Sequence, residues 1–218
     1  MEQSLKSNVE MWKILQERDY FATHPCYRQE DGSLLTKASD DQIIERFMDL
    51  AAKKRVAVIG CGYGRDVAVI APKVGHVWGI DVSELILGKA VAYLRERGCD
   101  NFTPVLAERW KEDLPGGLDL VYSCIVFQHL TRELVRDYIL NIPGKLAPHG
   151  EVLCQFADME YGTRDAGLEH PHEPSVRWNR QDIEALVAES GLNLYALERQ
   201  PIEGHGDWWW AHFGPAAR

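Results

Sequence analysis

The stretch RVAVIGCGYGRD, residues 55–66, decides the fold. An apolar run from Val56 to Ile59 favours a strand, and the spacing after the glycines predicts a helix from Arg65 to Pro72. Between them stand three glycines at alternating positions, which allow positive φ angles and leave no Cβ in a ligand's way. Backbone amides at the start of the helix would face a polar or anionic group. We interpret the stretch as a nucleotide-type binding turn, with a purely structural tight turn as the alternative.

The same alternation of strand and helix continues outward from this turn. Further strands are expected at 76–80, 102–106, 118–124, 151–156, 192–197 and 208–213, and helices at 83–97, 132–140 and 180–189. Two more helices, at about 5–15 and 43–51, precede the turn. Strands that alternate with helices predict an α/β doubly wound, mostly parallel sheet with helices on both faces. Ligands of such sheets bind at the carboxyl ends of the strands.

Composition limits the class of protein. The chain has 218 residues, of which 45% are apolar, and this fits one domain with a sizeable core. No apolar run approaches the roughly 20 residues of a membrane span, and the start MEQSLKSNVEMWK does not resemble a signal peptide. We therefore expect a cytoplasmic protein with no membrane partner. The five cysteines form no CxxC pair and are expected to be reduced thiols.

Charge argues against nucleic acid as a partner. The formal net charge is −9, and no dense cluster of lysine and arginine appears. A protein that binds a polyanionic backbone needs a basic face. Chemistry on a small molecule is therefore favoured.

The stretch GIDVSE, residues 79–84, indicates which nucleotide is bound. Asp81 ends the second strand about 20 residues after the turn, where a carboxylate accepts hydrogen bonds from two ribose hydroxyls. A dinucleotide fingerprint would read GxGxxG, but Arg65 stands where its third glycine belongs, and Gly64 makes the pattern GxGxG. This counts against a nicotinamide-dependent oxidoreductase, which stays open as an alternative.

With GCGYGRD, GIDVSE and LDLVYSCIVFQHL taken together, the chain resembles the class I S-adenosylmethionine (SAM)-dependent methyltransferases. The resemblance covers roughly residues 55–156. It implies a Rossmann-like seven-stranded sheet whose last strand is antiparallel, SAM as cofactor, and a single domain over 1–218. Residues 53–218 would form the core, and the N-terminal helices, within 1–52, a lid over the substrate.

The resemblance also implies cofactor contacts. The turn residues would lie beside the methionine part and ribose, Asp81 with Val82 at the ribose, an acidic position after the third strand at the adenine, and the end of the fourth strand at the sulfonium. The residues so assigned are Gly60, Cys61, Gly62, Gly64, Asp81, Val82, Ala107, Glu108, Ser123 and Cys124, with Ile125 beside them and Asp113 as the alternative to Ala107 and Glu108.

Two acidic positions need comment. Val58 stands where the family pattern (D/E)xGxGxG has its acidic residue, so a frequent hydrogen bond is missing and its loss must be compensated elsewhere, with the N-terminal helices as candidates. Asp66 lies in the first turn of the next helix, where a carboxylate offsets the helix dipole. We do not count it as a ligand.

Cys61 and Cys124 are interpreted as neutral packing residues because nothing nearby in the sequence would stabilise a thiolate.

Two other motifs invite functional interpretations. GHGDWWWAHF, residues 204–213, is favoured as a buried strand over an aromatic cage, because a strand covered on both faces tolerates a continuous apolar run. EHPHE, residues 169–173, has two histidines in a proline-bearing loop without a matching distant cluster, so no metal is predicted.

The predicted reaction is methyl transfer to an oxygen or nitrogen atom of a small polar acceptor by in-line displacement. The loop at 157–177, with residues 20–32, would shield the reaction and select the acceptor. His129, just after the fourth strand, is the candidate general base, the alternative being that it only shapes the pocket. A SAM-binding protein without methyl transfer would carry the same motifs and stays open. The expected assembly is a monomer or homodimer.

Overall fold

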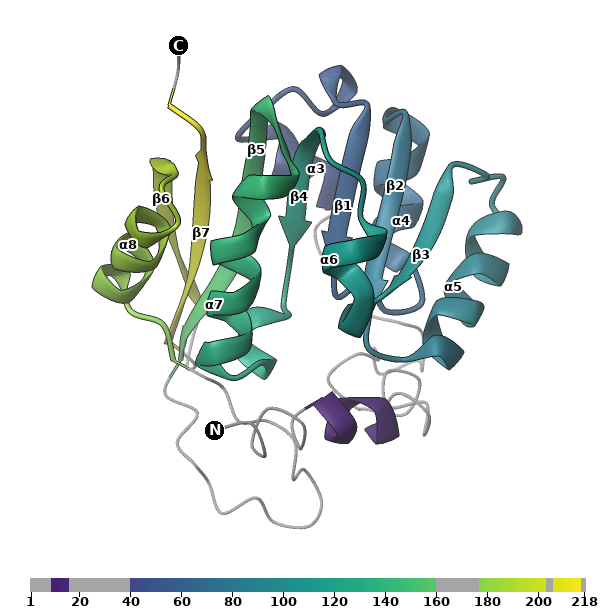
Figure 1. Cartoon of the computed structure of the whole chain (residues 1–218), viewed down its shortest axis with the longest axis horizontal. Helices are drawn as coiled ribbons and strands as arrows, with labels where there is room; N and C mark the ends of the chain where they lie inside the picture. Colours follow the sequence, from purple (N-terminus) through teal and green to yellow (C-terminus); the bar gives the residue numbers. More distant parts are fainter. Residues whose placement is uncertain (1–8, 16–39, 160–176, 203–205, 217–218) are drawn as a thin grey trace.

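One mixed sheet organises the molecule. The computed structural model of the chain describes residues 9–15, 40–159, 177–202 and 206–216. Seven strands lie in the order β3-β2-β1-β4-β5-β7-β6, and β7 is antiparallel to both β5 and β6 (Figure 1). Their bounds are β1 Arg55–Ile59, β2 His76–Asp81, β3 Phe102–Leu106, β4 Leu118–Ser123, β5 Leu146–Met159, β6 Asn193–Ile202 and β7 Gly206–Gly214. The predicted doubly wound fold with an antiparallel last strand is confirmed.

Helices connect the parallel strands. The described α-helices are residues 9–15, α3 Asp40–Glu45, α4 Arg65–Ile70, α5 Glu84–Arg95, α6 Trp110–Asp113, α7 Arg132–Asn141 and α8 Arg180–Glu189. Side chains cap the start of α5 and α8, since Ser83 Oγ accepts from the Ile86 amide at 3.4 Å and Asn179 Oδ1 accepts from the Asp182 amide at 2.9 Å. None of these helices is both long and apolar enough to cross a membrane within the described ranges.

The helix expected to run to about residue 51 is shorter than predicted. It ends as α3 at Glu45, and a 3-10 turn, η2 Leu50–Ala52, follows. Asp49 causes this second start, because its side chain accepts from the Ala51 amide and caps the turn. Each segment still buries one apolar residue, since Ile44 and Leu50 are fully buried.

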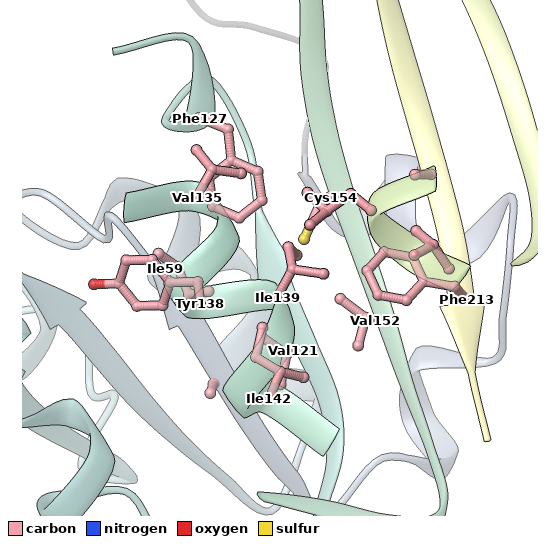
Figure 2. Packing of buried hydrophobic residues seen from close by; sticks show 14 of the residues in the cluster. Ile59, Val121, Phe127, Val135, Tyr138, Ile139, Ile142, Val152, Cys154 and Phe213 are labelled. Carbon is pink, nitrogen blue, oxygen red and sulfur yellow. The ribbon is translucent and has the colours of Figure 1, made fainter. Parts of the chain in front are cut away.

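Alternation along the central strands divides the core into two layers. On β1, Ala57 and Ile59 face one cluster, and Val56 and Val58 face the other. The first layer packs against α6, α7 and α8; Figure 2 shows Val135, Tyr138 and Ile139 of α7 beside residues of β1, β4 and β5. The second layer packs against α3, α4 and α5. This double coverage explains the continuous apolar runs of the central strands.

The aromatic tail forms part of this core. Trp210 is 1% exposed and belongs to the second layer, and Phe213 is fully buried in the first. Trp210 Nε1 donates to Gln200 Oε1 of β6 at 2.8 Å, which satisfies the buried indole. The interpretation of GHGDWWWAHF as a strand is confirmed for residues 206–213, whose strand β7 pairs with β5 and β6.

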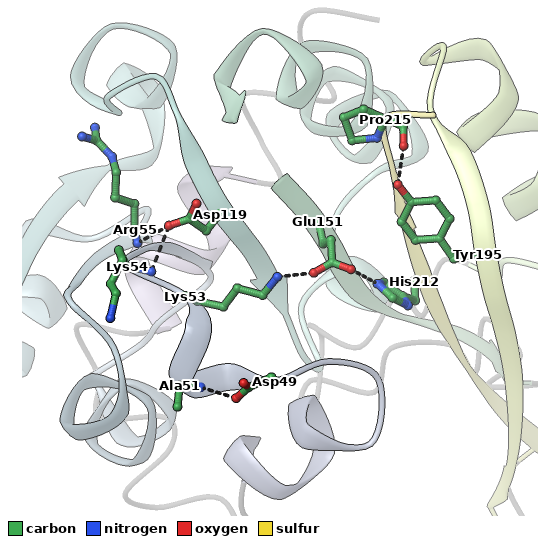
Figure 3. Close-up of polar contacts among 10 residues, drawn as sticks. All are labelled: Asp49, Ala51, Lys53, Lys54, Arg55, Asp119, Glu151, Tyr195, His212 and Pro215. Atoms are coloured by element: carbon green, nitrogen blue, oxygen red, sulfur yellow. Dashed lines mark hydrogen bonds and ion pairs between the residues drawn. The ribbon is translucent and has the colours of Figure 1, made fainter. Parts of the chain in front are cut away.

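At the amino ends of the parallel strands, polar side chains bond to groups of neighbouring segments (Figure 3). We call this end of the sheet the amino edge. Asp119 Oδ2 accepts from the backbone amides of Lys54 and Arg55, each at 2.9 Å. Glu151 pairs with Lys53 and contacts His212 Nε2 at 3.1 Å. These contacts fix the start of β1 to β4, β5 and β7.

Candidate functional site

The glycine turn, residues 60–64, follows β1 and is hydrogen-bonded to the carboxyl end of β2. The amides of Gly60 and Cys61 both donate to the carbonyl of Ile80, at 2.8 and 3.0 Å, so the turn is fixed to its neighbouring strand. Gly60 and Gly62 both have positive φ, but their surroundings differ. A Cβ on Gly60 would lie 2.2 Å from Val126 Cγ2, whereas one on Gly62 would have nothing within 4 Å. Gly60 therefore makes room for the chain itself, and Gly62 leaves space open.

Asp81 links the turn to the end of β2. Its carboxylate is 4% exposed, with Oδ2 accepting from the Gly62 amide at 2.9 Å and Oδ1 from the Val82 amide at 2.8 Å. Hydrogen bonds from amides stabilise the charged form of a buried carboxylate. Asp81 is thus fixed in orientation at the wall of a cavity that the turn borders.

This cavity is lined mainly by residues at the carboxyl ends of β1, β2 and β4 and by Trp12 of the helix at residues 9–15, which we call the first helix. Ten residues were predicted from the sequence to contact the cofactor. Seven of them line the cavity, namely Gly60, Cys61, Gly62, Asp81, Val82, Ala107 and Cys124, and so does His129. The structure thus brings together the three motifs that the sequence separates.

The other three predicted residues lie outside the lining. Gly64 is the N-cap of α4, and a Cβ there would meet Leu94 of α5 at 3.2 Å, so this glycine serves helix packing. Ser123 is fully buried, and its hydroxyl donates to the Ile59 carbonyl at 3.4 Å. Glu108 lies 3.9 Å from Lys13 of the first helix, with 61% of its side chain exposed. Asp113, the alternative, pairs with Arg109 on the surface.

Sequence reasoning missed several lining residues, of which the polar or aromatic ones are Trp12, Tyr63, Arg65, Asp66 and Tyr138. Asp66, interpreted from the sequence as a charge that offsets the helix dipole, is 9% exposed and also lines the cavity. The signal was present, because a residue that opens the helix after the third glycine faces the same space as the turn. Trp12 had no such signal.

His129 lies where the first helix meets the end of β4. The indole of Trp12 donates to the His129 carbonyl at 3.0 Å, and the two rings are 4.8 Å apart. The side-chain nitrogen of Gln128 lies 3.2 Å from His129 Nε2. Since an amide nitrogen only donates, Nε2 accepts in this arrangement and the neutral ring carries its proton on Nδ1. The basic lone pair of the imidazole therefore points at Gln128.

Burial controls the other ionisable groups of the lining. It raises the pKa of the Cys61 thiol well above its usual value, an effect to which the negative charges of Asp81 and Asp66 add. Burial likewise raises the pKa of Tyr138, with Asp81 contributing. Both groups stay protonated near neutral pH, so Cys61 has no thiolate to act as a nucleophile.

The turn after β4 is strained. Ile125 has a φ of +57° and is the single non-glycine residue with positive φ in the described part of the chain. A β-branched residue is unfavourable in this region of φ and ψ. The Ile125 amide donates to Oε1 of Gln155, a fully buried residue of β5, at 2.8 Å.

The described ranges contain no group of three or more His, Cys, Asp or Glu side chains arranged to hold a metal ion. The EHPHE motif at 169–173 and the loop residues 20–32 lie outside those ranges. The prediction of no metal at that motif therefore stays a prediction.

Comparison with known proteins agrees with this geometry. Residues 56–150 match the family model of a methyltransferase domain. The N-terminal Xaa-Pro-Lys N-methyltransferase 1 of Xenopus tropicalis is 28% identical over 145 residues, which are 65% of this chain and 62% of that protein. The ubiquinone biosynthesis O-methyltransferase of Methylococcus capsulatus is 26% identical over 196 residues, 73% of this chain and 82% of that protein. The chain thus spans less than two thirds of the first of these relatives.

The fold has solved counterparts. The magnesium protoporphyrin IX methyltransferase of Synechocystis PCC 6803, solved with bound S-adenosylhomocysteine (SAH), superposes with a TM-score of 0.67 at 16% identity. The alignment covers 96% of this chain and all of that one.

Proposed function

We propose that the chain is a class I SAM-dependent methyltransferase, which transfers a methyl group from SAM to a nitrogen or oxygen atom of a small polar molecule. One observation carries the proposal. A single cavity joins Gly62 and Asp81, which suit a nucleoside, to His129, which can accept a proton. Trp12 of the first helix borders the same cavity.

The residues present fit the cofactor. Gly62 has open space where a side chain would stand, and the neighbouring Asp81 carboxylate is held in place by two amides. We expect Asp81 to accept from the ribose hydroxyls, and Val82 and Ala107 to border the adenine. When bound, SAM supplies a methyl group on a positively charged sulfur, which is open to in-line attack.

Two charged residues that line the cavity support a proposal for how the missing acidic residue at Val58 is compensated. Val58 is buried in the core and offers no acceptor. Arg65 and Asp66 both line the cavity, with Arg65 Nε 3.6 Å from Asp66 Oδ1. A positive and a negative side chain at one end of a cavity complement the carboxylate and ammonium of an amino acid. We expect this pair to hold the methionine end of the cofactor in place of the missing acidic residue.

His129 is proposed as the general base. An alcohol or ammonium acceptor must lose a proton as it is methylated, and an imidazole accepts protons near neutral pH. The Nε2 lone pair is directed at the Gln128 amide, so an acceptor that reaches Nε2 would replace this contact. The remaining contribution of the chain is alignment of the reactants and exclusion of water.

We propose the helix at residues 9–15 as part of the lid. Trp12 is 6% exposed and packs on the His129 ring, and Lys13 reaches toward Glu108. A cavity closed by an indole favours an acceptor small enough to be enclosed. The oligomeric state and the cytoplasmic location stay predictions from the sequence.

A second acceptor class is favoured by one finding. The Xenopus tropicalis relative is named for methylation of protein N-termini, so the N-terminal amine of a peptide is the alternative acceptor. It would require the first helix to leave space for a chain that extends out of the cavity.

Transfer of labelled methyl groups decides between the two. The purified protein is incubated with methyl-labelled SAM and cell extract, and the products are separated by dialysis. We expect the labelled methyl group in small product molecules that pass through the dialysis membrane. Label retained on protein would favour the peptide acceptor, and absence of transfer, with SAH still bound in calorimetry, would favour a SAM-binding protein without methyl transfer.

Once an acceptor is known, His129→Ala tests the base. We expect kcat to fall by ~100-fold or more with little change in SAH affinity, and the acid limb of the pH–rate profile to disappear. A variant that keeps the wild-type rate and pH profile would mean that His129 only shapes the cavity.

A further inference from the structure

The turn after β4 is strained because a non-glycine residue, Ile125, occupies its position of positive φ. Ile125 lines the cavity with a φ of +57°. Such a conformation persists in a non-glycine residue only when the surrounding structure enforces it. A contact from outside the turn must therefore hold it.

Gln155 supplies that contact. Its side chain is fully buried on β5, thirty residues away in sequence, and Oε1 lies 2.8 Å from the Ile125 amide nitrogen. Its Nε2 donates more weakly, to the Phe156 carbonyl at 3.4 Å. Residues 152–157 are buried and apolar except for Gln155, and a buried amide side chain is costly unless it is hydrogen-bonded. Its placement is explained by the bond to the turn.

The next residue transmits this restraint to the glycine turn. Val126 follows Ile125 and packs against Gly60. A Cβ added to Gly60 would lie only 2.2 Å from Val126 Cγ2. The conformation of Ile125 thus sets how closely the turn after β4 approaches the glycine turn. Both turns line the cavity. Cys124, Ile125 and Val126 form one stretch of the cavity wall.

We propose that Gln155 is a positioning residue, which holds the strained turn Cys124–Val126 against Gly60 and so fixes the width of the cofactor cavity. The link between Gln155 and the turn stands by itself. Its consequence for the cofactor rests on the proposed function.

Gln155→Met tests the link, because methionine is close to glutamine in shape but lacks the strong oxygen acceptor. Hydrogen exchange of the cofactor-free protein is followed by mass spectrometry in peptides that cover 124–127. We expect exchange there to accelerate at least tenfold, while peptides of α7 keep their protection. Unchanged exchange at 124–127 would overturn the proposal.

SAH affinity, measured by calorimetry, tests the consequence. We expect Gln155→Met to weaken SAH binding about tenfold. The matched control is Asn101→Leu, which removes another structural amide; Asn101 Nδ2 donates to the Ala71 carbonyl at 2.8 Å and lies outside the cavity lining. Asn101→Leu should lower the melting temperature and leave SAH affinity unchanged. If Gln155→Met lowered the melting temperature alone, Gln155 would be merely structural.

Ile125→Gly provides the rescue. Glycine adopts positive φ without strain, so the turn no longer needs Gln155 to hold it. The double variant should bind SAH more tightly than the product of the two single effects predicts. Additive losses would overturn the proposal. Should Gln155→Met fail to fold, folding of the double variant decides in the same way: recovery supports the restraint, and failure contradicts it.

The outcomes separate the two proposals. If the wild-type protein does not bind SAH, the proposed function fails, and the exchange experiment still shows whether Gln155 holds the turn.

Discussion

The two ends of the parallel strands use their polar residues in opposite ways. At the carboxyl ends, Asp66 and Asp81 face a cavity, and the chain accepts positive φ at Gly62 and Ile125 to border it. At the amino edge, the carboxylates of Asp119 and Glu151 instead bond to groups of neighbouring strands. We interpret the open space and strain at one end as features of a binding site, while the contacts at the other end hold the sheet together.

Gly62→Val should break the cavity end most severely. The side chain would fill the space left at Gly62, so we expect SAH affinity to fall by ~100-fold or more. Gly98→Val is the control, because Gly98 also has positive φ and open space around it but lies outside the cavity lining. It should cost similar stability, read by thermal melting, and leave SAH binding intact. Equal SAH affinity in both variants would make the turn purely structural.

Asp81→Ala and Asp119→Ala compare the two ends directly, since each carboxylate accepts from two or more backbone amides. Both should lower the free energy of unfolding. Only Asp81→Ala should also weaken SAH binding, by about 1.5 to 3 kcal/mol, which is the cost of losing a charged acceptor. Calorimetric titration of both variants checks this. A similar loss of affinity in Asp119→Ala would mean that Asp81 acts through the fold alone.

Glu151→Ala should affect stability without function. Its partners Lys53 and His212 lose a shared acceptor that is largely shielded from water. We expect a loss of about 1 to 3 kcal/mol in the free energy of unfolding, measured with urea, because the remaining buried charge is uncompensated. SAH affinity should stay at the wild-type value. Reduced affinity here would show that the two ends of the sheet are coupled.

The smallest expected effect is a pH dependence of stability from the amino edge. Burial lowers the pKa of His212 below its usual 6.5, and the hydrogen bond that the ring donates to Glu151 opposes this only in part. The unfolded chain therefore binds the proton first as pH falls, so stability should decline from about pH 6.5 down to the folded pKa and then level off. Urea unfolding across this range measures it, and His212→Gln should remove this component. An unchanged pH profile in that variant would assign the decline to other groups.

The sequence predicted the parts of the site that depend on local pattern. Gly62 and Asp81 line the cavity as predicted, because each residue type stands at a fixed distance from a strand end. Most described elements were found likewise. Among the exceptions are α3, which ends at Glu45 and not near residue 51, and α6, whose four residues are too few to show a period.

The rest of the site depends on contacts between distant segments. Trp12 meets His129 over 117 positions, and Gln155 meets Ile125 over 30. Tyr122 donates to the buried carboxylate of Asp40 across 82 positions, at 2.6 Å, which ties α3 to β4. No local periodicity encodes such pairs, and the strain at Ile125 is visible only in the backbone angles.

The strand order places β3 and β6 at the two borders of the sheet, and this bears on self-association. An exposed border strand offers unpaired amides to another copy of the chain and can seed aggregates. Here β3 contains Pro104, which has no amide hydrogen, and β6 carries the exposed charges of Glu198 and Arg199 followed by Pro201. Proline and charge at these borders disfavour strand addition. We therefore expect concentrated solutions of this protein to resist the growth of cross-β assemblies through either border.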